Sequence, residues 1–478
     1  MPETFSDLRR GIRSPGECAS DPLPAIPSAR DPSSRKLRIH LICPRGPLYR
    51  HRGGIWKKTM RYAPLTLTTL ASLVPPEIAA EVRITDEGVD EIDLERMDAD
   101  LVGITAITGT APRAYEIAAR LRQRGIPVVL GGVHPTLMPE EAMQHADSTV
   151  VGYAEESWPQ LLRDFVTGRM AHRYDQSPKL RLDNLPFPRR QLYNTGLVNV
   201  AHTIEATRGC IFQCEFCVVP SAWGGKPLQK PVAHVVADIQ QMKAKRVIFL
   251  DLNLIADVAY AKELFTALVP LKIQWGGLAT TTIAWDDELL DLAARSGCRG
   301  LLIGFESLNQ QSLNEARKAF NMRRDYHEVV RKIRDRRIAL MGCFVFGFDH
   351  DTLSIFDETV DFVMETHMDL PRYAIAVPFP NTGLYKRLKG QGRITTENWG
   401  LYDGQHVVFE PKNMTAAELL ENTHRAWKKT YSYLAIGKRL NGSRTQLPIA
   451  IPANLGYRFY AYHLDTFYSC DWQLAPNA

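Results

Sequence analysis

Cysteine is scarce in this chain of 478 residues, which contains eight of them. A disulfide-stabilised extracellular scaffold needs a much higher density. Three of the eight fall within eight consecutive positions, a crowding typical of metal or redox chemistry in a reducing compartment. Long apolar runs are absent as well. No window approaches about 18 consecutive apolar residues, so we expect no integral membrane span.

Excess charge of one sign is also small. Lys and Arg number 58 against 53 Asp and Glu, a net charge of +5, and no basic block stands out. We therefore expect no nucleic-acid partner. The N-terminus lacks an apolar signal core, since Arg9-Arg10 is followed by Gly11-Ile12-Arg13, which argues against a twin-arginine export signal. These absences predict a cytoplasmic protein.

Composition and periodicity predict five segments. Residues 1–35, with six Pro, six Ser and five Arg, are expected to be a disordered lead-in. An α/β segment spans 36–167, a Pro-containing linker spans 168–200, and a second α/β segment spans 201–404. Residues 405–478 are expected to be a small, mostly helical and aromatic-rich region, with an amphipathic helix near 415–434.

The first α/β segment alternates short apolar strands with amphipathic helices. The strands are expected at 37–42, 80–84, 101–105, 127–130 and 148–151, and the helices at about 65–73, 112–124 and 137–145. Apolar strands separated by helices predict a parallel sheet covered on both faces, a doubly wound Rossmann- or flavodoxin-like domain. Such domains bind ligands beyond the carboxyl ends of their strands, here in the loops after Cys43, Thr105 and Leu130.

The second α/β segment contains six strand–helix units, which is enough for an open, partial (β/α)6 barrel. Its strands are expected at 202–206, 246–251, 273–278, 300–305, 339–346 and 373–377. Its helices are expected at about 231–243, 258–269, 286–296, 309–318, 325–336 and 353–366.

The crowded cysteines are Cys210, Cys214 and Cys217, a C-x3-C-x2-C spacing in a loop just after a predicted strand. Three thiolates on one short loop can hold three irons of a four-iron cluster and leave the fourth iron open to an exogenous ligand. A structural zinc site is the alternative. Zinc needs a fourth protein ligand, and no Cys or His pair follows Cys217 at short range.

This spacing, with the aromatic Phe216 before the last cysteine, resembles that of the radical S-adenosylmethionine (SAM) enzymes. The resemblance implies a [4Fe–4S] cluster whose open iron chelates SAM, which is cleaved to a 5′-deoxyadenosyl radical. It also implies that SAM is bound by residues at the ends of the barrel strands. They are Phe216 beside the cluster, Asp251 and Asn253 near the amino end of SAM, Glu306 and Ser307 near the ribose, and Gly347 near adenine. Ordinary turn or helix-cap roles are the alternative for Asp251, Asn253, Ser307 and Gly347.

A doubly wound domain ahead of such a barrel resembles the cobalamin-dependent class of these enzymes. Thr105-Ala106-Ile107 followed by Gly131-Gly132 is a loose version of the Ser-x-Leu and Gly-Gly pair of cobalamin-binding domains. The resemblance implies cobalamin contacts by Thr105, Ile107, Gly131, Gly132 and His134, the last as a loop residue near the nucleotide tail or as a cobalt contact. The lower-ligand motif Asp-x-His-x-x-Gly is missing, because the first loop contains only His51. A cofactor-free Rossmann-like module is the alternative.

The resemblance implies a cobalamin-dependent radical SAM C-methyltransferase. It would act on an unactivated carbon of a small or lipid-like substrate through methylcobalamin and the 5′-deoxyadenosyl radical, with a flavodoxin- or ferredoxin-type electron donor. A non-methylating radical reaction, such as oxidative cyclisation, ring contraction or carbon–carbon coupling, is the alternative within the class. A SAM-sensing or cluster-carrier protein would not need the first domain. Methylthiolation would need three further cluster cysteines there, where only Cys43 lies.

Overall fold

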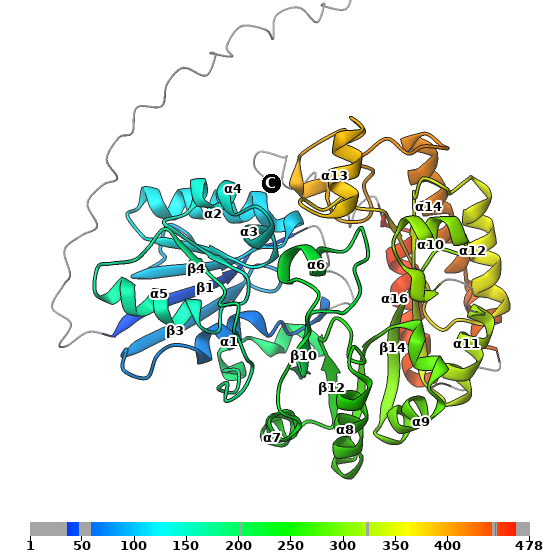
Figure 1. The fold of residues 1–478 in the computed structure, drawn as a ribbon, viewed down its shortest axis with the longest axis horizontal. Helices are drawn as coiled ribbons and strands as arrows, with labels where there is room; N and C mark the ends of the chain where they lie inside the picture. The colour runs from blue at the N-terminus through cyan, green and yellow to red at the C-terminus, as the bar shows by residue number, and fades with distance from the viewer. Residues whose placement is uncertain are drawn as a thin grey trace, which may run out of the picture.

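The computed structural model describes residues 36–46, 59–200, 202–321, 325–441, 445 and 447–464. The expected lead-in at 1–35 and His51 lie outside the described residues. Two α/β bodies stand side by side, and the later helices of the chain lie against the second body (Figure 1).

The first body is built on a parallel sheet in which the strand order reverses. The order is β3–β1–β4–β5–β6–β7, so β1 lies between β3 and β4 and marks the switch point. This is the flavodoxin-like order extended by one strand, and the doubly wound prediction is confirmed. The bounds are β1 Leu37–Cys43, β3 Ala80–Asp86, β4 Leu101–Thr105, β5 Val128–Gly131, β6 Ser148–Val151 and β7 Arg173–Asp175.

Successive residues of the central strands bury their side chains on opposite faces of this sheet. In β5, Val128 and Leu130 pack into the core under α2, whereas Val129 packs into the core that contains Trp158. Because both faces are buried, the strands have the near-continuous apolar character from which the sequence predicted two layers of helices. The helices are α1 Thr66–Ser72, α2 Ala111–Gln123, α3 Val133–Leu137, α4 Pro139–His145 and α5 Ser157–Val166.

The second body is a six-stranded, all-parallel sheet in simple sequential order, β16–β15–β14–β13–β12–β9. Strand and helix alternate through it, as expected for a partial (β/α)6 barrel. Its strands are β9 Thr203–Ile204, β12 Arg246–Phe249, β13 Gln274–Ala279, β14 Cys298–Glu306, β15 Ala339–Phe346 and β16 Arg372–Ile375. Its helices are α7 Val232–Met242, α8 Val258–Leu268, α9 Asp287–Arg295, α10 Gln310–Glu315, α11 Tyr326–Asp335 and α12 Ser354–Glu365.

Several elements lie outside the sequence prediction. Helix α5 and the two-stranded sheet of β2 (Thr59–Tyr62) with β8 (Val198–Val200) were not expected. The segment expected to be only a linker supplies β7, an edge strand of three residues that depends on pairing with β6. The same segment is fastened to the barrel by Arg190, which makes a two-point ion pair with Asp238.

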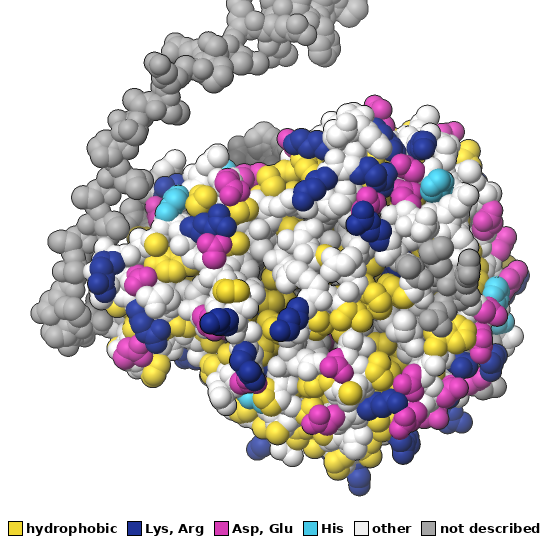
Figure 2. Space-filling view, viewed as in Figure 1, with side chains coloured by type: hydrophobic (Ala, Val, Ile, Leu, Met, Phe, Trp, Pro, Cys, Tyr) yellow, Lys and Arg dark blue, Asp and Glu magenta, His cyan; other side chains and the backbone are white. Residues whose placement is uncertain are grey.

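The region after the barrel is helical. It contains α13 Gly383–Gly390, α14 Ala416–Thr430, α15 Tyr433–Leu440 and α16 Leu447–Ala461, of which only α14 was expected. Among the helices of the described residues, none is both long and apolar enough to cross a bilayer. Figure 2 shows Lys and Arg side chains interspersed with Asp and Glu over one face of the molecule.

Candidate active site between the two domains

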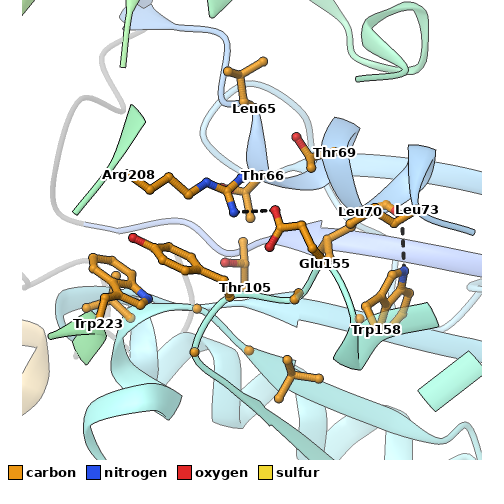
Figure 3. Close-up of a pocket in the computed structure, with 18 of the residues that line it drawn as sticks. Leu65, Thr66, Thr69, Leu70, Leu73, Thr105, Glu155, Trp158, Arg208 and Trp223 are labelled. Carbon is orange, nitrogen blue, oxygen red and sulfur yellow. Dashed lines mark hydrogen bonds and ion pairs between the residues drawn. The ribbon is translucent and has the colours of Figure 1, made fainter. Parts of the chain in front are cut away.

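A cavity of about 330 Å³ lies at the carboxyl ends of β4, β5 and β6 and reaches across to the barrel. Its inner wall is largely apolar and is formed by α1 with its flanking leucines, by the strand ends and by Trp158, whose indole N–H donates to the carbonyl of Leu70 at 3.2 Å (Figure 3). Its barrel-side wall comes from β10 (Thr207–Arg208) and from Leu250 and Leu252 beyond β12. One cavity therefore contacts both domains.

Four of the five residues expected to bind cobalamin line this cavity: Thr105, Ile107, Gly131 and Gly132. The Gly-Gly pair ends β5 where the chain turns into α3. Gly132 has a φ of +99°, and a Cβ there would lie 2.7 Å from Thr105 Oγ1, so any larger residue is strained and obstructed. Gly132 is therefore needed to bring the two predicted loops together at the cavity.

The structure does not bring His134 to the cavity. Its side chain is fully buried, one ring nitrogen lies 3.4 Å from Thr108 Oγ1 and the other 3.2 Å from Glu141 Oε1. The ring of Trp399 packs against it, with centroids 5.6 Å apart. With both nitrogens engaged, His134 joins the first domain to the later part of the chain, and neither the tail contact nor the cobalt contact fits this position.

Four residues on the rim of the cavity were missed by the sequence prediction. Tyr153 and Glu155 follow β6, and Arg208 and Trp223 flank the cysteine loop on the barrel side. The Arg208 guanidinium makes a short ion pair with Glu155 across the two domains (Figure 3). Ligands bind at the carboxyl ends of the strands, and this rule applies equally to the loop after β6. Tyr153 and Glu155 could therefore have been predicted from the sequence, whereas no sequence signal pointed to Arg208 and Trp223.

The cysteine loop follows β10 and ends where α6 (Val218–Trp223) begins. Burial raises the pKa of the Cys214 thiol to about 12 and that of the Cys217 thiol to about 11. Such thiols stay protonated at neutral pH unless an ion displaces the proton. No three Cys, His, Asp or Glu side chains within the described ranges are grouped closely enough to ligate one ion.

Asn253 lies directly against the cysteine loop. Its amide nitrogen is 3.6 Å from Cys210 Sγ, and the side chain is 1% exposed. Its amide oxygen is buried and has no hydrogen-bond partner among the described residues. A buried acceptor without a partner is costly, so it suits a ligand that brings a donor, such as the ammonium of SAM. The Asn253 position therefore fits the role that the sequence predicted for it.

Asp251 is engaged differently from the expectation. Its carboxylate accepts hydrogen bonds from the backbone amides of Ala206 and Thr207 and from Thr207 Oγ1 at 2.8 Å. Burial and nearby Glu205 raise the pKa of Asp251 to about 7. The N-terminus of the following helix, α8, is capped by Asp257 and not by Asp251. Asp251 thus holds the strand that leads into the cysteine loop, and its oxygens are occupied without SAM.

Glu306 ends β14 in the left-handed backbone region, with a φ of +67°. This strained turn points its side chain inward, where it forms a short ion pair with Lys318. The carboxylate also lies near enough to Cys214 and Cys217 to help raise their pKa values. Ser307 is 2% exposed and accepts from the backbone of Asn309 at 3.1 Å. Glu306 therefore faces the cysteines, with Lys318 as an ammonium that the sequence did not reveal.

Phe216 and Gly347 support the site from its barrel side. Phe216 packs against Phe348, with ring centroids 6.0 Å apart. Gly347 has a φ of +102°, and a Cβ there would lie 2.9 Å from a methyl of Leu419 in α14. This glycine is required by a turn and by close packing with the later helices.

A charged cluster fastens the middle of the cysteine loop to α13. Glu215, between Cys214 and Phe216, receives two hydrogen bonds from Arg387 at 3.1 and 3.2 Å. Arg387 also pairs with Glu315 and Asp349. Opposite charges therefore hold the loop from outside while its cysteines face the barrel.

The residues present fit the two implied groups. The apolar inner wall of the cavity suits a flat aromatic base, and the glycines at its edge leave room for a large planar ring. On the barrel side, the cysteine loop stands beside Asn253, whose nitrogen is near Cys210 Sγ and whose amide oxygen has no partner among the described residues. This donor set suits a three-cysteine iron–sulfur cluster with a bound amino acid group.

Two family models match the chain. One is the B12 binding domain over residues 74–162, and the other is the Radical SAM superfamily over residues 204–363. Both matched ranges lie within the two bodies described above.

Two curated relatives are each 32% identical to this chain, and both come from Chlorobaculum tepidum. The bacteriochlorophyllide d C-12(1)-methyltransferase aligns over 394 residues, 79% of this chain and 85% of the relative. The bacteriochlorophyllide d C-8(2)-methyltransferase aligns over 367 residues, 72% of this chain and 80% of the relative.

The fold also resembles a solved structure, that of the radical SAM methyltransferase TsrM from Kitasatospora setae with cobalamin and a [4Fe–4S] cluster bound. The TM-score is 0.60 at 18% identity, with 75% of each chain covered. At this identity the similarity concerns the fold alone.

Proposed function

The chain belongs to the cobalamin-dependent radical SAM enzymes, and from that premise we propose that it methylates an unactivated carbon on the periphery of a tetrapyrrole. Its cofactors are those of the family: cobalamin, a [4Fe–4S] cluster and SAM. The observation that supports the proposal most directly is the cavity shared by both domains, because the cobalamin-side loops meet Arg208 and Trp223 there, two residues that flank the cysteine loop.

Each domain contributes residues for one cofactor. We propose that Thr105, Ile107, Gly131 and Gly132 contact cobalamin, and that Cys210, Cys214 and Cys217 ligate the cluster. When bound, the cluster and SAM supply the radical that removes a substrate hydrogen, and cobalamin supplies the methyl group.

For SAM, we propose a different role for each of the residues predicted to bind it. Asn253 receives the ammonium through its unpartnered oxygen. Glu306 and Ser307 remain the proposed ribose contacts, in which case a ribose hydroxyl competes with Lys318 for the Glu306 carboxylate. Phe216 and Gly347 shape the wall behind them. Asp251 acts through the backbone of the preceding strand, since both of its oxygens are already bonded there.

A tetrapyrrole is favoured by two observations. The relatives with the greatest similarity reported above act on bacteriochlorophyllide d. In addition, one large apolar side chain from each domain lines the cavity and is exposed: Ile107 at 48% and Leu252 at 42%. Exposed apolar side chains that converge on one mouth suit a flat, largely apolar macrocycle.

A one-electron donor is needed to reduce the cluster, and we propose a flavodoxin- or ferredoxin-type protein. We also propose a cytoplasmic location, because cluster assembly requires reduced thiols.

The test begins with anaerobic reconstitution with iron, sulfide and hydroxocobalamin, followed by counts of iron and cobalt per chain. The loaded protein is then incubated with methyl-labelled SAM, dithionite and bacteriochlorophyllide d. Label in a methylated product supports the proposal. Formation of 5′-deoxyadenosine and an altered but unlabelled product would contradict methyl transfer and point to a cyclisation or coupling reaction instead.

A further inference from the structure

Three buried polar atoms on the rim of the cavity have no hydrogen-bond partner among the described residues. They are Tyr153 Oη, Glu155 Oε2 and Trp223 Nε1. Buried polar groups in folded proteins are nearly always bonded, and each exception calls for an explanation. Three exceptions that line one cavity indicate that a bound molecule supplies the missing partners.

The side chains that carry these atoms form a collar across the two domains. The rings of Tyr153 and Trp223 stack with centroids 5.1 Å apart and an interplanar angle of 4°. The Arg208 guanidinium lies 4.8 Å from the Tyr153 ring centroid and pairs with Glu155. It also donates to Glu205 at 2.8 Å. We use "collar" for Tyr153, Glu155, Arg208 and Trp223.

The chemistry of the three atoms restricts the ligand. The Tyr153 hydroxyl and the Trp223 indole offer two donors, and Glu155 Oε2 offers an acceptor. A phosphate accepts only, and the Glu155 carboxylate would repel it. A primary carboxamide both accepts and donates, so several such groups on one molecule satisfy all three atoms. The corrin ring of cobalamin carries primary amides around its edge, whereas its nucleotide tail carries a phosphate and a ribose.

We propose that Tyr153, Glu155 and Trp223 bind the side-chain amides of the corrin ring, and that Arg208 is a positioning residue that holds Glu155 in place from the barrel side. This inference rests on the proposed function, since it assumes that the cavity takes a corrinoid. It adds residues from both domains to a site that the strand-end loops alone would place in the first domain.

The collar also connects the corrinoid to the cysteine loop. Arg208 lies two positions before Cys210, and Trp223 ends the helix that begins directly after Cys217. A ligand that bonds to the collar therefore orders both ends of the segment that holds the cluster. By thermodynamic linkage, corrinoid affinity should be higher when the cluster is present than when it is absent.

The test measures dissociation constants by anaerobic absorbance titration with two probes, hydroxocobalamin and cobinamide, which keeps the corrin amides but lacks the nucleotide tail. The variants are Tyr153→Phe, Trp223→Phe and Glu155→Gln. We expect each to weaken both probes by a similar factor of about five to twenty, the usual effect of losing one hydrogen bond to a bound ligand. Tyr153→Phe keeps the stacked ring and removes only the hydroxyl, so lost packing does not explain a change in that variant.

Matched controls remove the same groups elsewhere. Tyr174→Phe removes a hydroxyl that donates to Asp164 at 2.8 Å, and Trp285→Phe alters a tryptophan beside Lys332. Neither residue lines the cavity, so both controls should bind the two probes like the wild type. Far-ultraviolet circular dichroism and the melting temperature of each variant show whether it is folded.

The outcomes separate this inference from the proposed function. Variants that bind cobalamin less tightly but cobinamide normally would place the collar on the nucleotide tail and overturn the inference. Unchanged affinity for both probes in folded variants would overturn it as well. If the wild-type protein bound neither probe, the proposed function itself would fail. The inference is supported if the variants bind both probes less tightly by an equal factor. It also requires that the gain in corrinoid affinity caused by the cluster is lost in Arg208→Lys.

Discussion

Arg387 anchors the cysteine loop, so its removal should release the cluster. It contacts three carboxylates at once: Glu215 within the loop, Glu315 after β14 and Asp349 after β15. The side chains of these carboxylates are 13%, 11% and 12% exposed. The perturbation is Arg387→Met, which keeps much of the aliphatic stem and deletes the charge.

The expected loss of stability follows from the charges left behind. Removal of one partner from a buried ion pair costs about 3–5 kcal/mol, because a buried charge then lacks compensation. Asp349 keeps a second partner, Arg393, at 2.8 Å. Glu215 and Glu315 lose the guanidinium with which both of them pair. We therefore expect a loss of about 3–5 kcal/mol near neutral pH, with part of it recovered as acid protonates the carboxylates.

The assay has two readouts: iron bound per chain after anaerobic reconstitution, and the melting temperature of the protein without iron. Both should fall in Arg387→Met. The matched control is Lys389→Met on the same helix, whose pair with Glu397 is 58% and 55% exposed. Exposed pairs contribute at most about 1 kcal/mol, so this variant should match the wild type. Wild-type iron content and melting temperature in Arg387→Met would refute the anchoring role.

The remaining predictions concern a ligand, a buried acid and a histidine. Cys214→Ala should lose the iron absorbance and the cleavage of SAM together; persistence of both would refute the ligand assignment. Burial raises the pKa of Asp351 from 3.8 to about 6. The wild type should therefore lose up to about 3 kcal/mol relative to Asp351→Asn as the pH rises from about 4 to about 6. Equal pH dependence in thermal melts would contradict this. His134→Gln should leave the absorption spectrum of bound cobalamin unchanged. A spectral shift would instead indicate that His134 contacts the cobalt.

Local patterns in the sequence were enough to predict both α/β bodies. Near-continuous apolar strands such as 128–131 can be buried only when helices cover both faces, and six further strand–helix units are enough for an open, partial barrel. The spacing of Cys210, Cys214 and Cys217 likewise indicated a cluster, because the chemistry is contained within one short loop.

What the sequence by itself determined is thus what depends on neighbouring residues: strand and helix periods, glycine at a turn, and cysteines on a loop. Only the tertiary structure decided the partners that come from distant segments. It placed Arg208 against Glu155, Lys318 against Glu306, and His134 in a buried contact away from the cavity. The physical reason is that charge pairing and burial depend on which strand ends lie close together in space. The hydrophobic periodicity of one segment carries no information about which distant segment it contacts.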